Sequence, residues 1–220
     1  MDWVWRNLGQ IGELMANHLG VSVIPILAGF ALSIPLGWAA TRHRTARAVL
    51  LSFGGILYTI PSIALFVTLP AMLGTGILDP VNVVVALTLY AVAIMIRSAA
   101  DAFASVPAEA RESADALGYS PVRRFLGVDL PLAGPILLAG VRVVSVSTVS
   151  LATVGSVIGV STLGNLFLDG FHRSFYLEIF VGIVLVLILA TVFDLILVAA
   201  GRLLMPWTAR PPRAPRAAVS

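Results

Sequence analysis

Between two long apolar runs, residues 111–131 read RESADALGYSPVRRFLGVDLP, the most polar stretch between the first and last apolar segments. Pro107 fits the first turn of a helix, where its missing N–H group is no loss. Gly118 stands where a left-handed helix C-cap is expected, and Ser120 is a candidate N-cap of a second short helix. The pattern predicts a helix, a glycine turn and a second helix between two membrane spans. On these residues alone an ordinary solvated loop is the simpler interpretation, because polar loops between spans are common.

Apolar residues dominate the composition. Hydrophobic residues make up 59% of the 220, charged residues only 11%, and the mean hydropathy is +0.99. Because soluble domains carry about 25% charged residues, we expect an integral membrane protein. The isoelectric point near 9.9 indicates a basic membrane face before it indicates nucleic acid, and no aromatic-plus-basic nucleic-acid motif is present.

Two absent residue types limit the chemistry. There is no cysteine, which excludes disulfides, thiol chemistry and cysteine metal sites. All basic residues other than histidine are arginine, and the missing lysine excludes a Walker A lysine and a Schiff-base lysine. The chain therefore cannot itself be a P-loop ATPase, and any work drawn from ATP needs a partner. The sequence has no HExxH pair and no carboxylate cluster in one span, which disfavours a membrane enzyme and predicts no catalytic residue, cofactor or metal site.

Hydropathy and length predict an all-α polytopic membrane protein with five transmembrane helices, since a bilayer core requires about 20 apolar residues per helix. The predicted spans are residues 21–40, 50–73, 81–96, 132–158 and a fifth within 177–204.

The segments outside these spans have simpler assignments. Residues 1–20 carry apolar side chains at helical spacing and are predicted to form an interfacial helix with a Trp anchor. His18 is then an ordinary interfacial residue. Residues 159–176 are predicted to be a polar-aromatic loop, and residues 205–220 a disordered cytoplasmic tail. The chain is thus expected to be one transmembrane domain with a five-span core at 21–204.

Arginine asymmetry sets the predicted orientation, because cytoplasmic loops of membrane proteins carry an excess of basic residues. Five alternating spans then place the N-terminus outside, and the C-terminus and the polar stretch in the cytoplasm. The outer side holds Arg6 and Arg173. The cytoplasmic side holds Arg42, Arg44, Arg47, Arg97, Arg111, Arg123, Arg124, Arg202, Arg210, Arg213 and Arg216.

Two charged residues fall within or near spans. Asp194 lies well inside the fifth span, and an intramembrane carboxylate is by default a functional candidate, such as a gate or an ion-pair partner. We favour the simpler interpretation that Asp194 lies near the cytoplasmic end and pairs with an arginine such as Arg202, two turns further on, to stabilise packing. Arg142, on the early part of the fourth span, can snorkel or pair with a carbonyl or an acid.

The fourth span is rich in small and hydroxyl residues, which let helices approach closely and bond across lipid-embedded interfaces. Because the hydroxyl groups spread around the helix, we expect it to line a pore or a dimer interface; generic packing is the alternative. The residues concerned are Gly140, Ser145, Ser147, Thr148, Ser150, Thr153, Gly155 and Ser156.

The polar stretch resembles a motif of the permease subunits of ABC-type importers. That motif reads Glu-Ala-Ala, three residues, Gly, nine residues, Ile, one residue, Leu-Pro. Every spacing is intact here, and the departures are Ser113 for the first Ala and Val128 for Ile. In that family the short helix docks into a cleft on the ATP-hydrolysing subunit. The matched positions are Glu112-Ser113-Ala114, Gly118, Val128 and Leu130-Pro131.

Further segments resemble the glycine betaine/choline branch of these permeases. They are residues 59–66, 87–91, 130–135 with 139–142, and 159–170. The chain departs from the branch at 160–162, which is often richer in glycine, and at Ser98-Ala99, where Asn-Thr is common.

The resemblance implies the type I ABC importer permease fold in the plasma (inner) membrane. It implies two permease subunits, two ATP-hydrolysing subunits and an extracytoplasmic solute-binding protein. The implied solutes are small osmoprotectants of the glycine betaine, choline, carnitine or proline-betaine type. The coupling region is 98–130, and the residues expected to couple to the ATPase subunit are Arg111, Glu112, Ser113, Ala114, Leu117, Gly118, Tyr119, Val128, Leu130 and Pro131.

The sequence is less decisive about the translocation path and the solute. No clustered aromatic cage for a quaternary ammonium group is visible, so we expect the binding protein to supply most of the selectivity. The same architecture importing methionine, a sulfonate or another small solute is the first alternative. An autonomous channel or proton-coupled carrier is the second, and it would depend on Asp194. The residues assigned to the path are Pro61, Ser62, Ser145, Thr148, Thr153 and Asp194.

Overall fold

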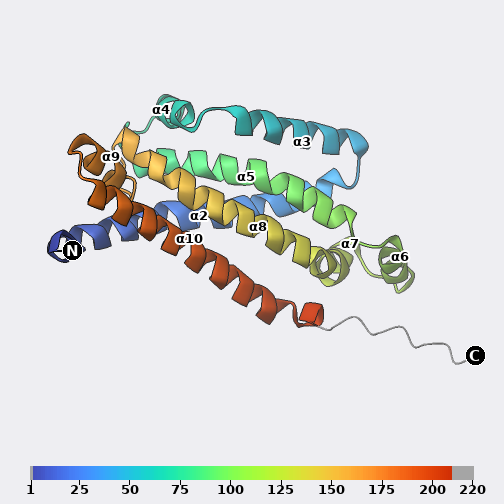
Figure 1. Ribbon diagram of the computed structural model, residues 1–220. Coiled ribbons are helices and arrows are strands. Elements are labelled where there is room, and N and C mark those ends of the chain that lie inside the picture. The colour runs from blue at the N-terminus through green and yellow to red at the C-terminus, as the bar shows by residue number, and fades with distance from the viewer. Residues whose placement is uncertain (1, 210–220) are drawn as a thin grey trace, which may run out of the picture.

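The computed structural model describes residues 2–209, and these residues form helices joined by short connections (Figure 1). The elements are α1 (Asp2–Arg6), α2 (Leu8–Ala40), α3 (Arg44–Thr59), α4 (Ser62–Leu73), α5 (Pro80–Ala104), α6 (Ala108–Ala116), α7 (Pro121–Arg124), the π-helical turn η1 (Phe125–Asp129), α8 (Leu130–Ala152), the 3-10 helix η2 (Thr153–Ile158), α9 (Asn165–His172), α10 (Tyr176–Leu204) and the 3-10 turn η3 (Pro206–Ala209). The all-α prediction is confirmed for the described part of the chain.

Within residues 2–209, four helical segments are long and apolar enough to cross a membrane. They are α2, α5, the continuous run Pro121–Ile158 and α10. Helices α3 and α4 together make a fifth candidate, but they are bent by 102° relative to each other. The predicted span at 50–73 is therefore not one helix but is divided between α3 and α4. Pro61 disfavours helical backbone at Ile60, which is extended (φ −67°, ψ 129°).

The first span is longer than predicted. Helix α2 begins at Leu8 and runs for 33 residues. Most of the segment predicted as a separate interfacial helix, residues 1–20, therefore belongs to α2, and in the described part of the chain only the short helix α1 precedes it. The reason is that Ile11 and Leu14 are buried against the bundle and do not lie on a membrane surface. Pro25 and Pro35 lie inside the helix, as transmembrane helices tolerate.

Other boundaries also differ from the predictions. Helix α5 extends eight residues beyond the predicted end at 96, to Ala104. The segment predicted as a loop at 159–176 contains a helix, α9. Residues 206–209 of the predicted disordered tail form η3; residues 210–220 lie outside the described part of the chain.

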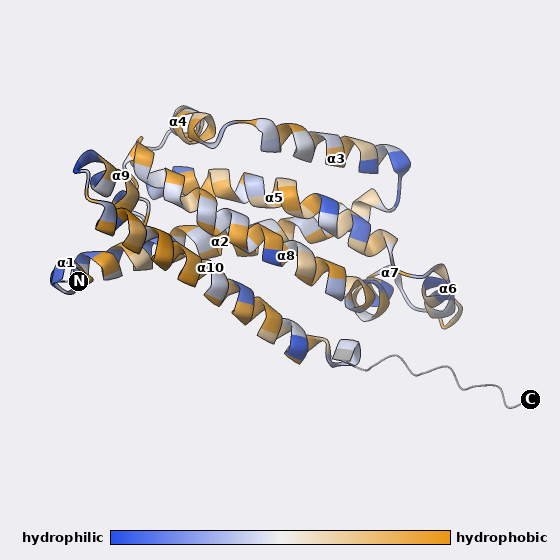
Figure 2. Ribbon diagram, viewed as in Figure 1, coloured by the Kyte–Doolittle hydropathy of each residue, from blue (hydrophilic) through white to orange (hydrophobic). Residues whose placement is uncertain are grey.

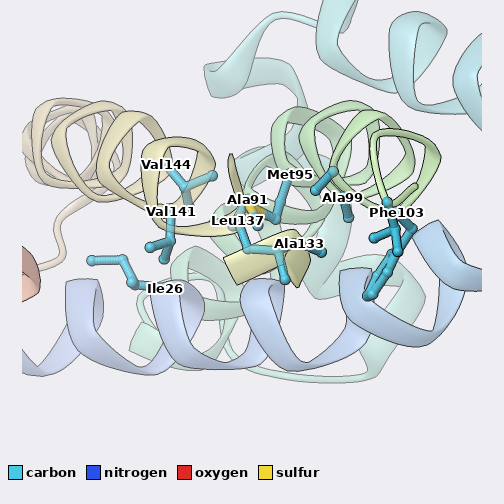
Figure 3. Packing of buried hydrophobic residues seen from close by; sticks show 11 residues of the cluster. Ile26, Ala91, Met95, Ala99, Phe103, Ala133, Leu137, Val141 and Val144 are labelled. Carbon is cyan, nitrogen blue, oxygen red and sulfur yellow. The ribbon is translucent and has the colours of Figure 1, made fainter. Parts of the chain in front are cut away.

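Helices α2, α5 and α8 form the centre of the bundle. The main core lies between them, and Figure 3 shows side chains from all three helices meeting there. Close approach is possible because the contact positions are small. A Cβ atom added to Gly37 on α2 would lie 2.5 Å from the Cβ of Ala99 on α5, and one added to Gly140 on α8 would lie 2.6 Å from the Cβ of Ser98.

The outer helices cover this centre from two sides. Helices α3 and α4 pack on α5, whereas α10 packs on α8 (Figure 1). Helix α10 is apolar along most of its length (Figure 2) and largely exposed, as expected for a helix that faces lipid or another apolar surface.

The two ends of the bundle differ in character. Helices α1, α4 and α9 lie at one end, and α6, α7 and the C-terminal end of α10 lie at the other (Figure 1). The charged helix α6 projects beyond the apolar bundle (Figure 2). The polar stretch at residues 111–131 thus lies at one end of the molecule.

Candidate functional site

The residues 108–129, comprising α6, α7 and η1, are here called the polar element. Helix α6 begins at Ala108 with Pro107 as its N-cap, so Pro107 stands just before the first turn in which it was predicted. The helix ends in a Schellman motif: the N–H of Tyr119 donates to Ala114 O (3.1 Å) and that of Gly118 to Asp115 O (3.0 Å). Gly118 has φ +75°, as predicted for a left-handed C-cap.

The second helix of the polar element also follows its local sequence. Ser120 is the N-cap of α7, and its hydroxyl accepts from the N–H of Arg123 at 3.4 Å. Pro121 occupies the first helical position, where no N–H group is needed. The predicted helix–glycine turn–helix is confirmed.

A buried carboxylate joins the parts of the polar element. Asp129, in η1, is only 1% exposed. Its Oδ1 accepts from Arg111 Nε of α6 at 2.8 Å, and its Oδ2 lies 3.8 Å from Arg124 Nε of α7. Arg111 also donates to the carbonyl of Phe103 at the end of α5. Because a buried charge is costly unless paired, this arrangement fixes α6 to both α5 and the start of α8.

The remaining face of α6 is open. Glu112 is exposed, and Leu117 is 75% exposed although it is apolar. Beside them lies a cavity of about 400 Å³ between α6 and the start of α8. The lining residues are Ala110, Ser113, Ala114, Leu117, Tyr119, Gly127, Val128, Pro131, Leu132 and Trp207.

The ten residues predicted for coupling thus fall into distinct places. Six of them line this cavity. Of the rest, Arg111 pairs with Asp129, Glu112 is exposed and Gly118 forms the turn. Leu130 packs against the main core and connects the polar element to α8.

The residues predicted for the translocation path are not gathered at one place in the described chain. Pro61 and Ser62 lie at the break between α3 and α4. Ser145 and Thr148 are buried on α8, Thr153 begins η2, and Asp194 lies on α10. Helices α4 and α10 lie on opposite sides of the α5–α8 pair (Figure 1).

Asp194 pairs with an arginine, as the simpler interpretation expects, but the partner is Arg142 and not Arg202. Arg142 Nε and Nη2 donate to the two carboxylate oxygens of Asp194 at 2.6 and 2.8 Å. Arg202 is eight residues further along the same helix, about 12 Å along the axis. The bidentate pair joins α8 to α10 within the apolar bundle, where paired charges are the rule.

His18 is the residue that the sequence reading missed, since it is fully buried and does not lie at an interface with lipid. Its Nδ1 accepts from the N–H of Leu163 (3.3 Å), so in the neutral ring Nε2 carries the proton and donates to the carbonyl of Val149 (3.0 Å). That carbonyl would pair with the N–H of Thr153 if α8 continued, but Thr153 starts a 3-10 helix and donates to Ser150 and Leu151. His18 replaces the missing donor.

The sequence contained a signal for this role. His18 lies four residues after Leu14 and three before Val21, on one face of the helix. Both neighbours are buried. An apolar face on either side indicates that His18 points into the bundle.

Comparison with known proteins identifies the class. The model of the family described as "Binding-protein-dependent transport system inner membrane component" matches residues 20–210. The chain belongs to this family. The predicted family resemblance is confirmed.

Three relatives are similar to this chain over most of its length. The choline transport system permease protein OpuBB of Bacillus subtilis is 32% identical over 94% of both chains. The glycine betaine/carnitine/choline transport system permease protein OpuCB of the same organism is 30% identical over 94% of both. The osmoprotectant import permease protein OsmW of Salmonella typhimurium is 30% identical over 90% of this chain and 93% of that one.

Solved structures confirm the fold. A chain of the MetNI methionine ABC transporter in an inward-facing conformation superposes with a TM-score of 0.71 at 20% identity, covering 92% of this chain and 98% of that one. A chain of an amino acid ABC transporter superposes with a TM-score of 0.69 at 14% identity, covering 93% and 96%. The fold is that of type I ABC importer permeases.

The role of His18 can be tested by removing both of its hydrogen bonds. In His18→Leu the carbonyl of Val149 and the N–H of Leu163 lose their partner, which costs about 1–3 kcal/mol for each buried unpaired group. We expect a lower free energy of unfolding and faster hydrogen–deuterium exchange at the Leu163 amide.

The matched control is His172→Leu, because His172 is exposed at the end of α9. It should leave both quantities near the wild-type values. Equal exchange at the Leu163 amide in His18→Leu and wild type would show that His18 does not stabilise the connection between η2 and α9.

Proposed function

We propose that this chain is the permease subunit of an ATP-driven importer for small osmoprotectants of the glycine betaine, choline and carnitine type. The observation that carries the proposal is the importer motif from Glu112 to Pro131, which runs through α6, α7 and η1 into the start of α8 and ties the projecting helix α6 to the bundle at Asp129. The relatives named for choline, glycine betaine and carnitine transport support the solute class.

The arrangement of arginines supports a cytoplasmic position for the polar element. Arg42 and Arg44 follow α2 at the end where α6 and α7 lie, together with Arg111 and Arg124 of the polar element (Figure 1). Basic residues concentrate on the cytoplasmic side of membrane proteins. In this orientation the N-terminus is outside, and the exposed face of α6 is available to a cytoplasmic ATPase subunit.

The mechanism follows from how α6 is held. ATP binding closes two partner ATPase subunits, and α6, seated in a cleft of one of them, moves with it. Because Arg111 bonds both to Asp129 at the start of α8 and to Phe103 at the end of α5, the displacement reaches two central spans together. The spans of two permease subunits then tilt and open a path for solute delivered by an extracytoplasmic binding protein.

Uptake by the assembled complex tests the solute class. In vesicles containing the permease, its ATPase subunit and its binding protein, unlabelled choline and carnitine should compete with labelled glycine betaine, whereas methionine and sulfonates should not. Competition by methionine alone would favour the alternative importer. Uptake by the permease without an ATPase subunit would contradict the proposal and favour a channel or carrier.

Two variants of the polar element test the coupling role. Gly118→Val places a β-branched residue at φ +75°, which the left-handed region strongly disfavours, and Glu112→Ala removes an exposed charge from α6. We expect solute-stimulated ATP hydrolysis and uptake to fall by about tenfold or more in Gly118→Val, equivalent to about 1.4 kcal/mol, because the strained turn displaces α6, while membrane insertion is unchanged. Glu112→Ala should reduce both activities in the same direction.

Gly76→Val is the matched control, because Gly76 is exposed at the opposite end of the bundle and an added Cβ there meets no atom within 4 Å. It should transport like the wild type. Normal uptake in both Gly118→Val and Glu112→Ala would contradict the proposal that α6 couples the permease to the ATPase subunit.

A further inference from the structure

A small basic cavity lies between the C-terminal end of α2 and the polar element. It has a volume of about 120 Å³. Its lining contains three guanidinium groups and one carboxylate, so it carries an excess of positive charge. The lining residues are Trp38, Thr41, Arg42, Arg111, Arg124 and Asp129.

The bonding capacity of the three arginines is only partly used. Arg111 is committed to Asp129 and to the carbonyl of Phe103. Arg124 pairs through Nη1 with Asp115, but its Nε–H is buried and has no hydrogen-bond partner among the described residues. The nearest carboxylate oxygen of Asp129 is 3.8 Å away, too far for a good hydrogen bond. A buried donor of this kind calls for an acceptor.

Arg42 supplies a further free cation at a fixed position. Its guanidinium carbon lies 4.3 Å from the centre of the Trp38 ring, a cation–π contact. The Trp38 ring is itself packed against Phe125 of η1, with ring centres 5.0 Å apart. Among the described residues, Arg42 has no ion pair within 4.0 Å. A stacked guanidinium keeps its N–H donors available in the plane of the group, which is the geometry that binds phosphate oxygens.

The position of the cavity matches the headgroup level of a membrane. Trp38 lies in the last turn of α2, where an amphipathic ring marks the boundary between bilayer and water. Basic pockets between transmembrane helices on the cytoplasmic side are suited to anionic lipid headgroups. The charge of Asp129 is already opposed by Arg111 and Arg124, so it does not cancel the contribution of Arg42.

We propose that this cavity binds a phosphate group, with Arg42 and the Nε–H of Arg124 as the donors. The group is carried either by an anionic phospholipid of the same leaflet or by a free phosphate ion. In both cases the bound anion connects the end of α2 to the polar element. Among the described residues, these two parts are otherwise in contact there only through side-chain packing, such as that of Trp38 on Phe125. The binding chemistry is independent of the transported solute, and only the assignment to the cytoplasmic leaflet depends on the proposed orientation.

The test measures lipid retention by the full-length chain in nanodiscs of phosphatidylcholine with a minority of phosphatidylglycerol. Native mass spectrometry would compare wild type, Arg42→Gln and Arg44→Gln. Arg44 is the matched control, because it is exposed at the start of α3, two residues after Arg42, and does not line the cavity. We expect phosphatidylglycerol retention to fall by about fivefold in Arg42→Gln and to be unchanged in Arg44→Gln. Arg42→Lys, which keeps the charge but loses the planar fork, should fall by less.

A second arm identifies the source of the phosphate. In nanodiscs of phosphatidylcholine alone, inorganic phosphate should raise the unfolding temperature of wild type and Arg44→Gln above that in chloride of equal ionic strength if the site takes a free ion. That increase should be absent in Arg42→Gln. Retention without this increase assigns the site to the lipid.

Two results would overturn the site. One is that Arg42→Gln retains phosphatidylglycerol and responds to phosphate as the wild type does. The other is that Arg42→Gln and Arg44→Gln lose retention equally, which would indicate a diffuse surface charge. Neither readout involves transport, so a failure here is separate from a failure of the importer proposal.

Discussion

The structure depends on the carboxylate of Asp129, which is buried at the junction between the polar element and α8. An unpaired charge at this position would be strongly destabilising, and the guanidinium of Arg111 compensates it at 2.8 Å. That ion pair determines where α6 lies. Because Arg111 reaches the end of α5 at the same time, α6 cannot move freely relative to the spans, and this constraint makes it suitable for transmitting force.

Close contacts and side-chain pairs connect the helices of the bundle to one another. Glycine and alanine bring the backbones of α2 and α5 into close contact at Gly37 and Ala99. The bidentate pair of Arg142 with Asp194 attaches α10 to α8. At the opposite end, His18 connects α2 to the end of α8. Of these attachments, the one made by His18 pairs buried polar groups that would otherwise remain unsatisfied in an apolar interior.

The polar element was predictable because its caps and turns depend on neighbouring residues. The contacts between residues far apart in the sequence were not predictable. Gly118, Ser120 and the flanking prolines specify caps and turns through neighbouring residues, and the structure contains these features as predicted. The pairing of Arg142 with Asp194 and the contacts of His18 join residues far apart in sequence, where one sequence offers no partner information. Pro61 was visible in the sequence, but hydropathy predicted one continuous span, because hydropathy contains no information about a change in the direction of the chain.

The central claim is that the buried ion pair at Asp129 carries motion between α6 and the spans. The most direct measurement is solute-stimulated ATP hydrolysis by the reconstituted complex with Asp129→Asn, compared with Asp101→Asn. Asp101 also pairs with an arginine, Arg47 at 2.6 Å, but its side chain is 52% exposed, and such surface pairs contribute little. The account predicts that ATP hydrolysis no longer responds to solute in Asp129→Asn and responds normally in Asp101→Asn. A normal response in Asp129→Asn would contradict it.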